Sequence, residues 1–177
     1  MATKNWAIDP THSEIQFKVK HLMITTVTGS FNSFSATAQT EENDFTKAAI
    51  SFTADVNSID TGNEQRDGHL KSADFFEAEK YPQLKFTATK IDNATGESFD
   101  LHGDLTIKDV TKNIKLSVEF GGIAVDPYGN TKAGFTLSGK INRKDFGLTW
   151  SAVTEAGGVV VSDDVRLAAE IQLVQQA

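Results

Sequence analysis

Residues 114–120 read IKLSVEF, and this stretch predicts the architecture of the chain around it. Apolar side chains stand at every second position from Ile114 to Phe120, and the positions between them are polar. Successive side chains of an extended strand point to opposite faces, so a period of two is typical of a strand with one buried and one solvated face. The stretch therefore predicts a β-strand of an antiparallel sheet.

The same alternation recurs on both sides of this stretch. It is found at residues 15–19, 50–56, 84–88, 135–141 and 165–173, with less regular strands expected at 27–39 and 98–108. Turn residues separate the segments, most clearly in Asp126-Pro127-Tyr128-Gly129-Asn130, where Asp, Pro and Gly each favour a tight hairpin. The pattern predicts about eight strands, so the chain is expected to be all-β.

The apolar faces of these strands must share one interior. About eight long antiparallel strands can form a sandwich, or they can close into a barrel that has no exposed edges. An eight-stranded barrel is filled by its own side chains or holds one small ligand. Small residues at the inward positions favour a hollow interior: Ala36, Ala38, Ala54, Ala88, Gly139 and Ala169.

Composition limits the classes of function. The 177 residues suit a single domain, taken as residues 1–177, and the net charge of −7 disfavours a nucleic-acid partner. The absence of cysteine excludes disulfides and thiolate chemistry. No apolar run is long enough for stable membrane insertion, and the N-terminus has no secretory signal. A cytoplasmic location is expected, or a periplasmic one if a leader was removed.

One charged segment interrupts the strands. Residues 61–73, TGNEQRDGHLKSA, are predicted to form a helix over 62–71, with Thr61 and Glu64 as a capping box. Asp74 and Glu77 suggest a second short turn that extends the helical segment to about residue 78. Two interpretations stay open: the segment is a structural plug, or it is a lid whose polar face meets the head of a ligand.

Catalytic and metal-binding patterns are weak. Asp9, His12 and Ser13 lie close together, but neighbouring strand residues point to opposite faces and no nucleophile elbow is present. The four histidines lack the spacing of a metal site. We therefore expect no catalytic residues, no metal and no cofactor.

The chain resembles the YceI-like family of lipid-binding proteins along nearly its whole length. The most specific match runs from Ser58-Ile59-Asp60-Thr61-Gly62 to Arg66-Asp67-x-His69-Leu70-Lys71-Ser72-x-Asp74-Phe75-Phe76. Further matches are Trp6-x-Ile8-Asp9-Pro10-x-His12-Ser13, Thr28-Gly29-x-Phe31, Gly103-Asp104-Leu105-Thr106-Ile107 and Ile141-Asn142-Arg143-Lys144-Asp145-Phe146-Gly147-Leu148. One departure is Asp109, which stands where a glycine is usual.

The resemblance implies an extended, lipocalin-like antiparallel barrel of eight strands, an isoprenoid or similar amphiphile in its bore, and often a homodimer. The predicted ligand contacts combine inward strand positions with the polar face of the helix. They are Phe17, Val19, His21, Phe31, Phe52, Val56, Asn63, Arg66, His69, Leu70 and Phe86.

The leading functional hypothesis is a non-enzymatic protein that binds, stores or transports a long apolar molecule with a polar head. The ligand class would be a polyisoprenoid, an isoprenoid quinone or a fatty-acid-like lipid. Two alternatives differ in class: an enzyme acting on a small molecule inside the barrel, aided by His21 or His69, and a structural module with a solidly packed interior.

Overall fold

The alternating segments form one antiparallel sheet in the computed structural model, which describes residues 2–151 and 160–177. The strands are β1 (Thr3–Ile8), β2 (Glu14–His21), β3 (Thr25–Phe31), β4 (Phe34–Glu41), β5 (Asp44–Asp55), β6 (Ile59–Asp60), β7 (Gln83–Asp92), β8 (Ser98–Ile107), β9 (Val110–Val125), β10 (Thr131–Asn142) and β11 (Asp164–Gln175). The helical elements are α1 (Glu64–Leu70) and the 3₁₀ turns η1 (Pro10–His12), η2 (Val56–Ser58) and η3 (Arg143–Phe146).

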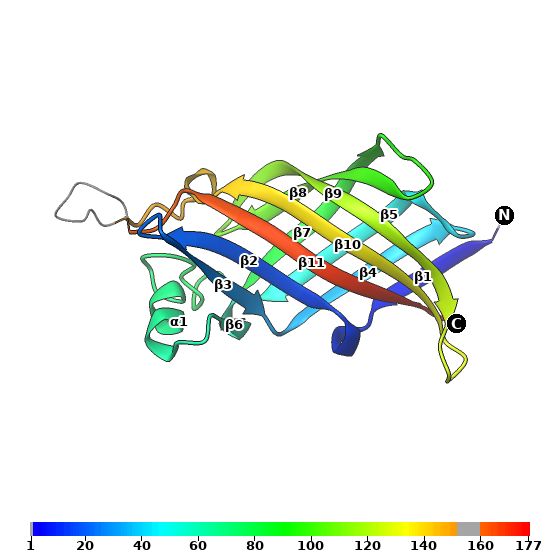
Figure 1. Cartoon of the computed structure of the whole chain (residues 1–177), viewed down its shortest axis with the longest axis horizontal. Helices are drawn as coiled ribbons and strands as arrows, with labels where there is room; N and C mark the ends of the chain where they lie inside the picture. The colour runs from blue at the N-terminus through cyan, green and yellow to red at the C-terminus, as the bar shows by residue number, and fades with distance from the viewer. Residues whose placement is uncertain (1, 152–159) are drawn as a thin grey trace.

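The sheet closes on itself. Its strand order is β1-β4-β5-β7-β8-β9-β10-β11, and β11 pairs back onto β1 with Ile8 opposite Leu173. Strand β2 follows β1 after η1 and pairs with the other half of β11, while β3 lies beside β2. The result is the predicted eight-stranded barrel, elongated along its axis (Figure 1). Two of its eight strand positions are each made of two shorter strands, β1 with β2 and β4 with β3.

The two ends of the barrel are built differently. Both chain termini and the β9–β10 hairpin lie at one end, whereas α1, η3 and the β2–β3 hairpin lie at the other (Figure 1). We call the end with the termini the closed end and the end with α1 the mouth. No helix among residues 2–151 and 160–177 has the length and apolar character needed to span a bilayer.

The inward register agrees with the alternation in the sequence. Phe86, Leu101, Val118 and Phe135 are buried, while their strand neighbours Lys85, Thr87 and Thr136 are exposed. The predicted strand over 27–39 is broken at Asn32 and Ser33, which form a bend between β3 and β4.

The barrel wall splits between β9 and β10. Their pairing runs from Thr131 opposite Val125 to Ser138 opposite Ser117 and ends there. Beyond this point β9 pairs only with β8, and β10 only with β11. Phe146 of η3, 1% exposed, lies at this split, where Gly139 sits against the carbonyl of Lys115.

The predicted helix is real but shorter than expected, and its predicted capping box is wrong. Helix α1 spans seven residues, and the side chain of Asn63, not Thr61, caps it by accepting a hydrogen bond from Arg66 N. Thr61 cannot cap because its hydroxyl is already bonded between Arg66 and Asp67. The region proposed as a second helical turn, near Asp74, consists of hydrogen-bonded turns without a helix.

Candidate functional site

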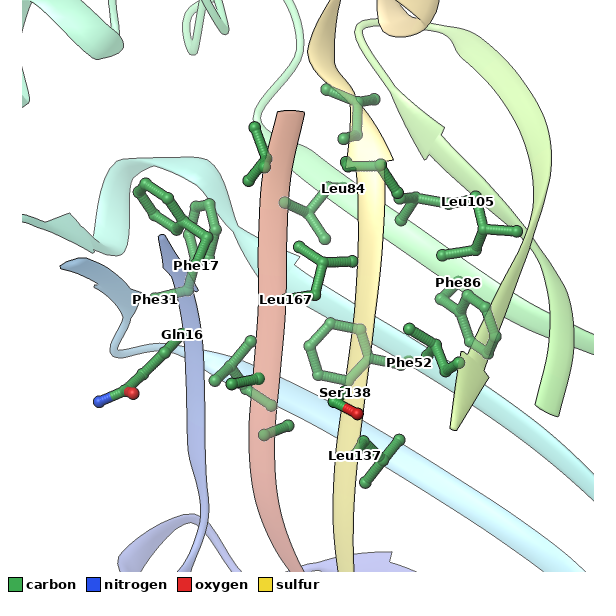
Figure 2. A pocket seen from close by; sticks show the side chains of 18 of the residues that line it. Gln16, Phe17, Phe31, Phe52, Leu84, Phe86, Leu105, Leu137, Ser138 and Leu167 are labelled. Atoms are coloured by element: carbon green, nitrogen blue, oxygen red, sulfur yellow. The ribbon is translucent and has the colours of Figure 1, made fainter. Parts of the chain in front are cut away.

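A cavity of about 430 Å³ runs inside the barrel. This volume lies within the range of small-molecule sites, so the interior is hollow and not solidly packed. Its wall is made of inward side chains from nearly every strand, and Figure 2 shows them gathered around the bore. The apolar lining includes Ile15, Phe17, Val19, Phe31, Phe52, Leu84, Phe86, Leu105, Leu116, Leu137, Leu167 and Ile171.

Glycines in the wall make room for three of these lining residues. A β-carbon on Gly29 would lie 2.3 Å from the ζ carbon of Phe17, and one on Gly103 would lie 2.3 Å from that of Phe86. A β-carbon on Gly139 would lie 2.6 Å from Leu116. The far end of each large side chain therefore occupies the space that a β-carbon would take on a neighbouring strand. We call these three contacts the glycine seats.

The bore ends in an aromatic cluster near the termini. The ring of Phe45 lies 5.0 Å from the rings of both Trp6 and Phe135, and Phe120 lies 5.3 Å from Phe135. Trp6 is 1% exposed, and its indole N–H donates to Thr40 Oγ1 over 3.0 Å. The burial and the satisfied N–H are those of a structural plug.

An ion cluster lies beside this plug. Lys132 Nζ is 2.8 Å from Asp9 Oδ2 and 3.5 Å from Asp126 Oδ2. The Lys132 ammonium holds the pKa of Asp9 well below its usual range, with a further contribution from His12 at 2.8 Å, and the pKa of Lys132 is raised in turn. These charges tie the β9–β10 hairpin to the end of β1.

The mouth is bordered by α1. Arg66 lines the cavity and donates to Thr61 twice, from Nε to Oγ1 over 2.7 Å and from an Nη to the backbone oxygen over 2.6 Å. Asp67 accepts from Thr61 N and from Thr61 Oγ1. These bonds use two of the five N–H groups of the guanidinium, so Arg66 braces α1 and still has donors available at the rim.

An aromatic group completes this side of the mouth. The His69 ring lies edge-on to Phe75 and Trp150, with centroids 5.1 and 5.0 Å away, and all three residues line the cavity. His69 Nε2 is 2.9 Å from Asp74 Oδ2, which orients the imidazole. The imidazole is thus bonded to Asp74 and packed against two aromatic rings.

A buried arginine also lies at the mouth. Arg143 is 3% exposed, and it donates from Nε to the carbonyl of Ser162 and from Nη1 to the carbonyls of Leu148 and Trp150, all within 3.0 Å. Burial lowers the pKa of Arg143, and Asp163 at 3.6 Å partly opposes this shift. The guanidinium remains charged at neutral pH and fastens two chain segments to η3.

Most of the residues predicted as ligand contacts meet around the bore. Phe17, Val19, His21, Phe31, Phe52, Arg66, His69, Leu70 and Phe86 line the cavity. Val56 does not, because β5 ends at Asp55 and Val56 is buried in the turn η2. Asn63 caps α1 instead of facing the cavity. Contact of the nine lining residues with a ligand stays a prediction.

Arg143 is not among the residues predicted as ligand contacts. The residue lies in the quoted Ile141-Asn142-Arg143 stretch, two positions after the inward Ile141. The period of two that predicts inward apolar residues also puts Arg143 on the inward face. A charged residue at an inward position is rare unless it is paired, so this position could have been recognised as a structural or functional one.

The Asp9, His12 and Ser13 side chains do not form a triad. Asp9 and His12 do pair, but Ser13 Oγ accepts a hydrogen bond from the backbone N–H of Gln172 at 3.0 Å instead of joining them. Within residues 2–151 and 160–177, no group of three His, Asp or Glu side chains is arranged to hold a metal ion.

Comparison with known proteins gives consistent matches. The family model described as the YceI-like domain matches residues 6–173. A UPF0312 protein of Pectobacterium atrosepticum is 38% identical over 165 residues, which cover 93% of this chain and 82% of that protein.

Solved structures agree with this match. A YceI protein of Campylobacter jejuni is 36% identical with a TM-score of 0.76, over 89% of this chain and 90% of that one. A polyisoprenoid binding domain from Saccharophagus degradans shares the fold at 17% identity, with a TM-score of 0.68 and coverage of 97% and 98%.

Proposed function

This chain belongs to the YceI-like family, and on that basis we propose that it binds a long apolar molecule with a polar head inside its barrel. The ligand would be a polyisoprenoid or a lipid of similar shape. Its tail would lie along the bore, and its head would remain at the mouth. The protein would hold or carry this ligand without changing it chemically.

The distribution of polar groups carries the proposal. The middle of the cavity is surrounded by aliphatic and phenyl side chains, and the charged side chains Arg66 and Arg143 and the imidazole of His69 lie at the mouth. The labelled Gln16 amide points away from the apolar cluster in Figure 2. Such a gradient fits an amphiphile better than a uniformly polar substrate or a globular apolar one.

The energetics are sufficient for useful affinity. Burying ten methylene groups contributes about 8 kcal/mol before costs. Loss of translational freedom and ordering of a flexible chain offset a large part of this gain. The fold shared with the polyisoprenoid binding domain of Saccharophagus degradans supports an isoprenoid as the ligand class.

The glycine seats provide the test. Gly29→Ala would place a methyl group where the Phe17 ring now lies, so the ring must turn into the bore and narrow it. Protein purified without detergent would be analysed by native mass spectrometry and by organic extraction. We expect the natural chain to carry an apolar amphiphile and Gly29→Ala to carry several-fold less.

Two further variants make the result specific. Gly29→Ala combined with Phe17→Leu should restore binding, because the smaller side chain leaves the bore open again. Gly96→Ala, in an exposed turn where an added β-carbon meets nothing within 4 Å, should bind like the natural chain. An empty natural chain that also takes up no added polyprenol would reject the proposed function.

A further inference from the structure

Three large apolar side chains are exposed at the tip of the β2–β3 hairpin. Leu22 is 38% exposed, Met23 58% and Ile24 76%. Only Val125 and Tyr128 are comparable among the described residues, and both belong to the β9–β10 hairpin at the closed end. Three consecutive exposed apolar residues on a protruding turn mark a contact surface more strongly than scattered ones do.

The backbone of this turn is strained. A hydrogen bond of 3.1 Å from Ile24 N to His21 O closes it, and its central residues have positive φ, 52° for Leu22 and 60° for Met23. Asn-Gly is the usual sequence for such a pair of positions, because bulky side chains are disfavoured at positive φ. The chain accepts strain at a site where polar residues would fit better, which points to a role for the apolar side chains.

The turn lies at the mouth and is held firmly there. Leu22 N donates to Val160 O over 2.9 Å, and Lys20 and Ser162 exchange two hydrogen bonds. Ser162 O in turn accepts from Arg143. The preceding residue, His21, lines the cavity. The tip therefore belongs to the rim of the mouth, at the same end of the barrel as α1 (Figure 1).

Basic side chains lie on β2 below the tip. Residues 15–40 contain no aspartate or glutamate, in a chain that has 24 acidic residues and a net charge of −7. Lys18 and Lys20 lie on β2 just below the tip, and the pairing register puts Lys18, Arg166 and Lys140 in one row across β2, β11 and β10. The row keeps its positive character although Asp164 lies 3.6 Å from Lys140. The basic row thus lies on the wall next to the apolar tip, and the nearby Asp163 is paired with Lys144 at 3.3 Å.

We propose that the mouth docks on the surface of an anionic lipid bilayer, with Leu22, Met23 and Ile24 inserted among the lipids and Lys18 and Lys20 facing the head groups. The proposal rests on the proposed function and adds the source of the ligand. Apolar residues beside basic ones are the combination that peripheral membrane contacts use. An amphiphile that passes from a docked bilayer into the bore avoids exposing its tail to water.

The test measures binding to vesicles. Co-sedimentation would use large vesicles of phosphatidylcholine with about 30% phosphatidylglycerol, a composition that gives the surface a negative potential, compared with phosphatidylcholine alone. The key variant is Leu22→Asn with Met23→Gly, which removes two apolar side chains and supplies the residues that the turn geometry favours. We expect it to lower partitioning to the anionic vesicles at least tenfold while its melting temperature stays equal or rises.

Matched variants separate the two parts of the surface. Tyr128→Asn removes an apolar side chain that is 89% exposed at the closed end and should leave vesicle binding unchanged. Lys18→Gln with Arg166→Gln should reduce binding to anionic vesicles several-fold and flatten its dependence on salt.

The outcomes distinguish this inference from the proposed function. Binding of a pyrene-labelled fatty acid from solution reports on the bore alone. Two results would overturn membrane docking and leave the proposed function of the bore intact, provided that uptake of this probe is normal. In the first, the natural chain does not bind the anionic vesicles; in the second, the Leu22→Asn, Met23→Gly variant binds them as well as the natural chain does. A tip variant that instead abolishes self-association in sedimentation velocity would assign the surface to a second copy of the chain.

Discussion

The two ends of the barrel use similar residues for opposite purposes. At the closed end Trp6 is buried, its N–H is satisfied by Thr40, and phenyl rings surround it. At the mouth Trp150 is half-buried, packs against His69 and Phe75, and lines the cavity.

This difference separates stability from access. The closed end joins β1, β5, β9 and β10 through packed rings and the Asp9–Lys132 pair. The mouth depends instead on hydrogen bonds between side chains and carbonyls of irregular segments. Elements with few packed apolar contacts open most readily, so exchange of a ligand should take place at the mouth.

The largest expected effect tests the plug itself. Trp6→Ala should lower the free energy of unfolding by about 3–5 kcal/mol, since it leaves a cavity in a rigid aromatic cluster. Trp150→Ala should lower it by less than half as much, because that ring is partly solvated. Chemical denaturation measures both, and equal losses would remove the distinction between the two ends.

Arg143 differs from Arg66, which also lies at the mouth, because it is buried and holds the structure together there. Arg143→Met should cost about 2–4 kcal/mol, since the carbonyls of Leu148, Trp150 and Ser162 lose their donor. Arg143→Lys keeps the charge but cannot reach three carbonyls at once, and should recover less than half of the loss. Full recovery by lysine in urea denaturation would show that charge alone matters.

Acid should weaken the closed end through Asp9. Its pKa is depressed in the folded state, so its contribution is complete above the unfolded value of about 3.9 and is lost as pH falls from there toward the folded pKa. Asp9→Asn should therefore cost about 1.5–3 kcal/mol at pH 7. The difference between this variant and the natural chain should shrink below about pH 4 in denaturation curves, and a constant difference down to about pH 2 would contradict the assignment.

Arg66→Gln should have the smallest effect on stability and a selective effect on binding. Arg66 is exposed, and its loss removes two hydrogen bonds to Thr61, so the melting temperature should fall by no more than a few degrees. Affinity for a polyprenyl phosphate should drop about tenfold, but affinity for a headless hydrocarbon of equal length should not. Equal weakening of both ligands in titrations would make Arg66 only a brace for the lid.

The sequence was informative wherever structure is set locally. Alternation predicted the inward positions of β2, β7, β9, β10 and β11, because the face on which a strand residue lies depends only on its place in the strand. The helix was also predicted, since its cap and its charged face lie within a few residues of each other.

The errors arose where distant segments decide. Thr61 and Asn63 are both good caps, and the bonds from Thr61 to Arg66 and Asp67 determine which one is used. The partners of Arg143 come from segments up to 19 residues away. The positive φ of Leu22 and Met23 has no sign in the residues themselves, because neither is of the type that favours it.

The glycine seats imply that the calibre of the bore can change in steps. At Gly29 an added methyl group would meet only the side chain of Phe17, whereas at Gly103 it would also lie 2.7 Å from the carbonyl oxygen of Thr87 and at Gly139 it would lie 3.3 Å from that of Lys115. Gly29 is therefore the position at which the internal diameter can change with the least displacement of the backbone. Family members that carry alanine or serine at these positions are expected to accept thinner molecules. The residues at the three glycine seats would then decide whether a branched or only a straight chain fits the bore.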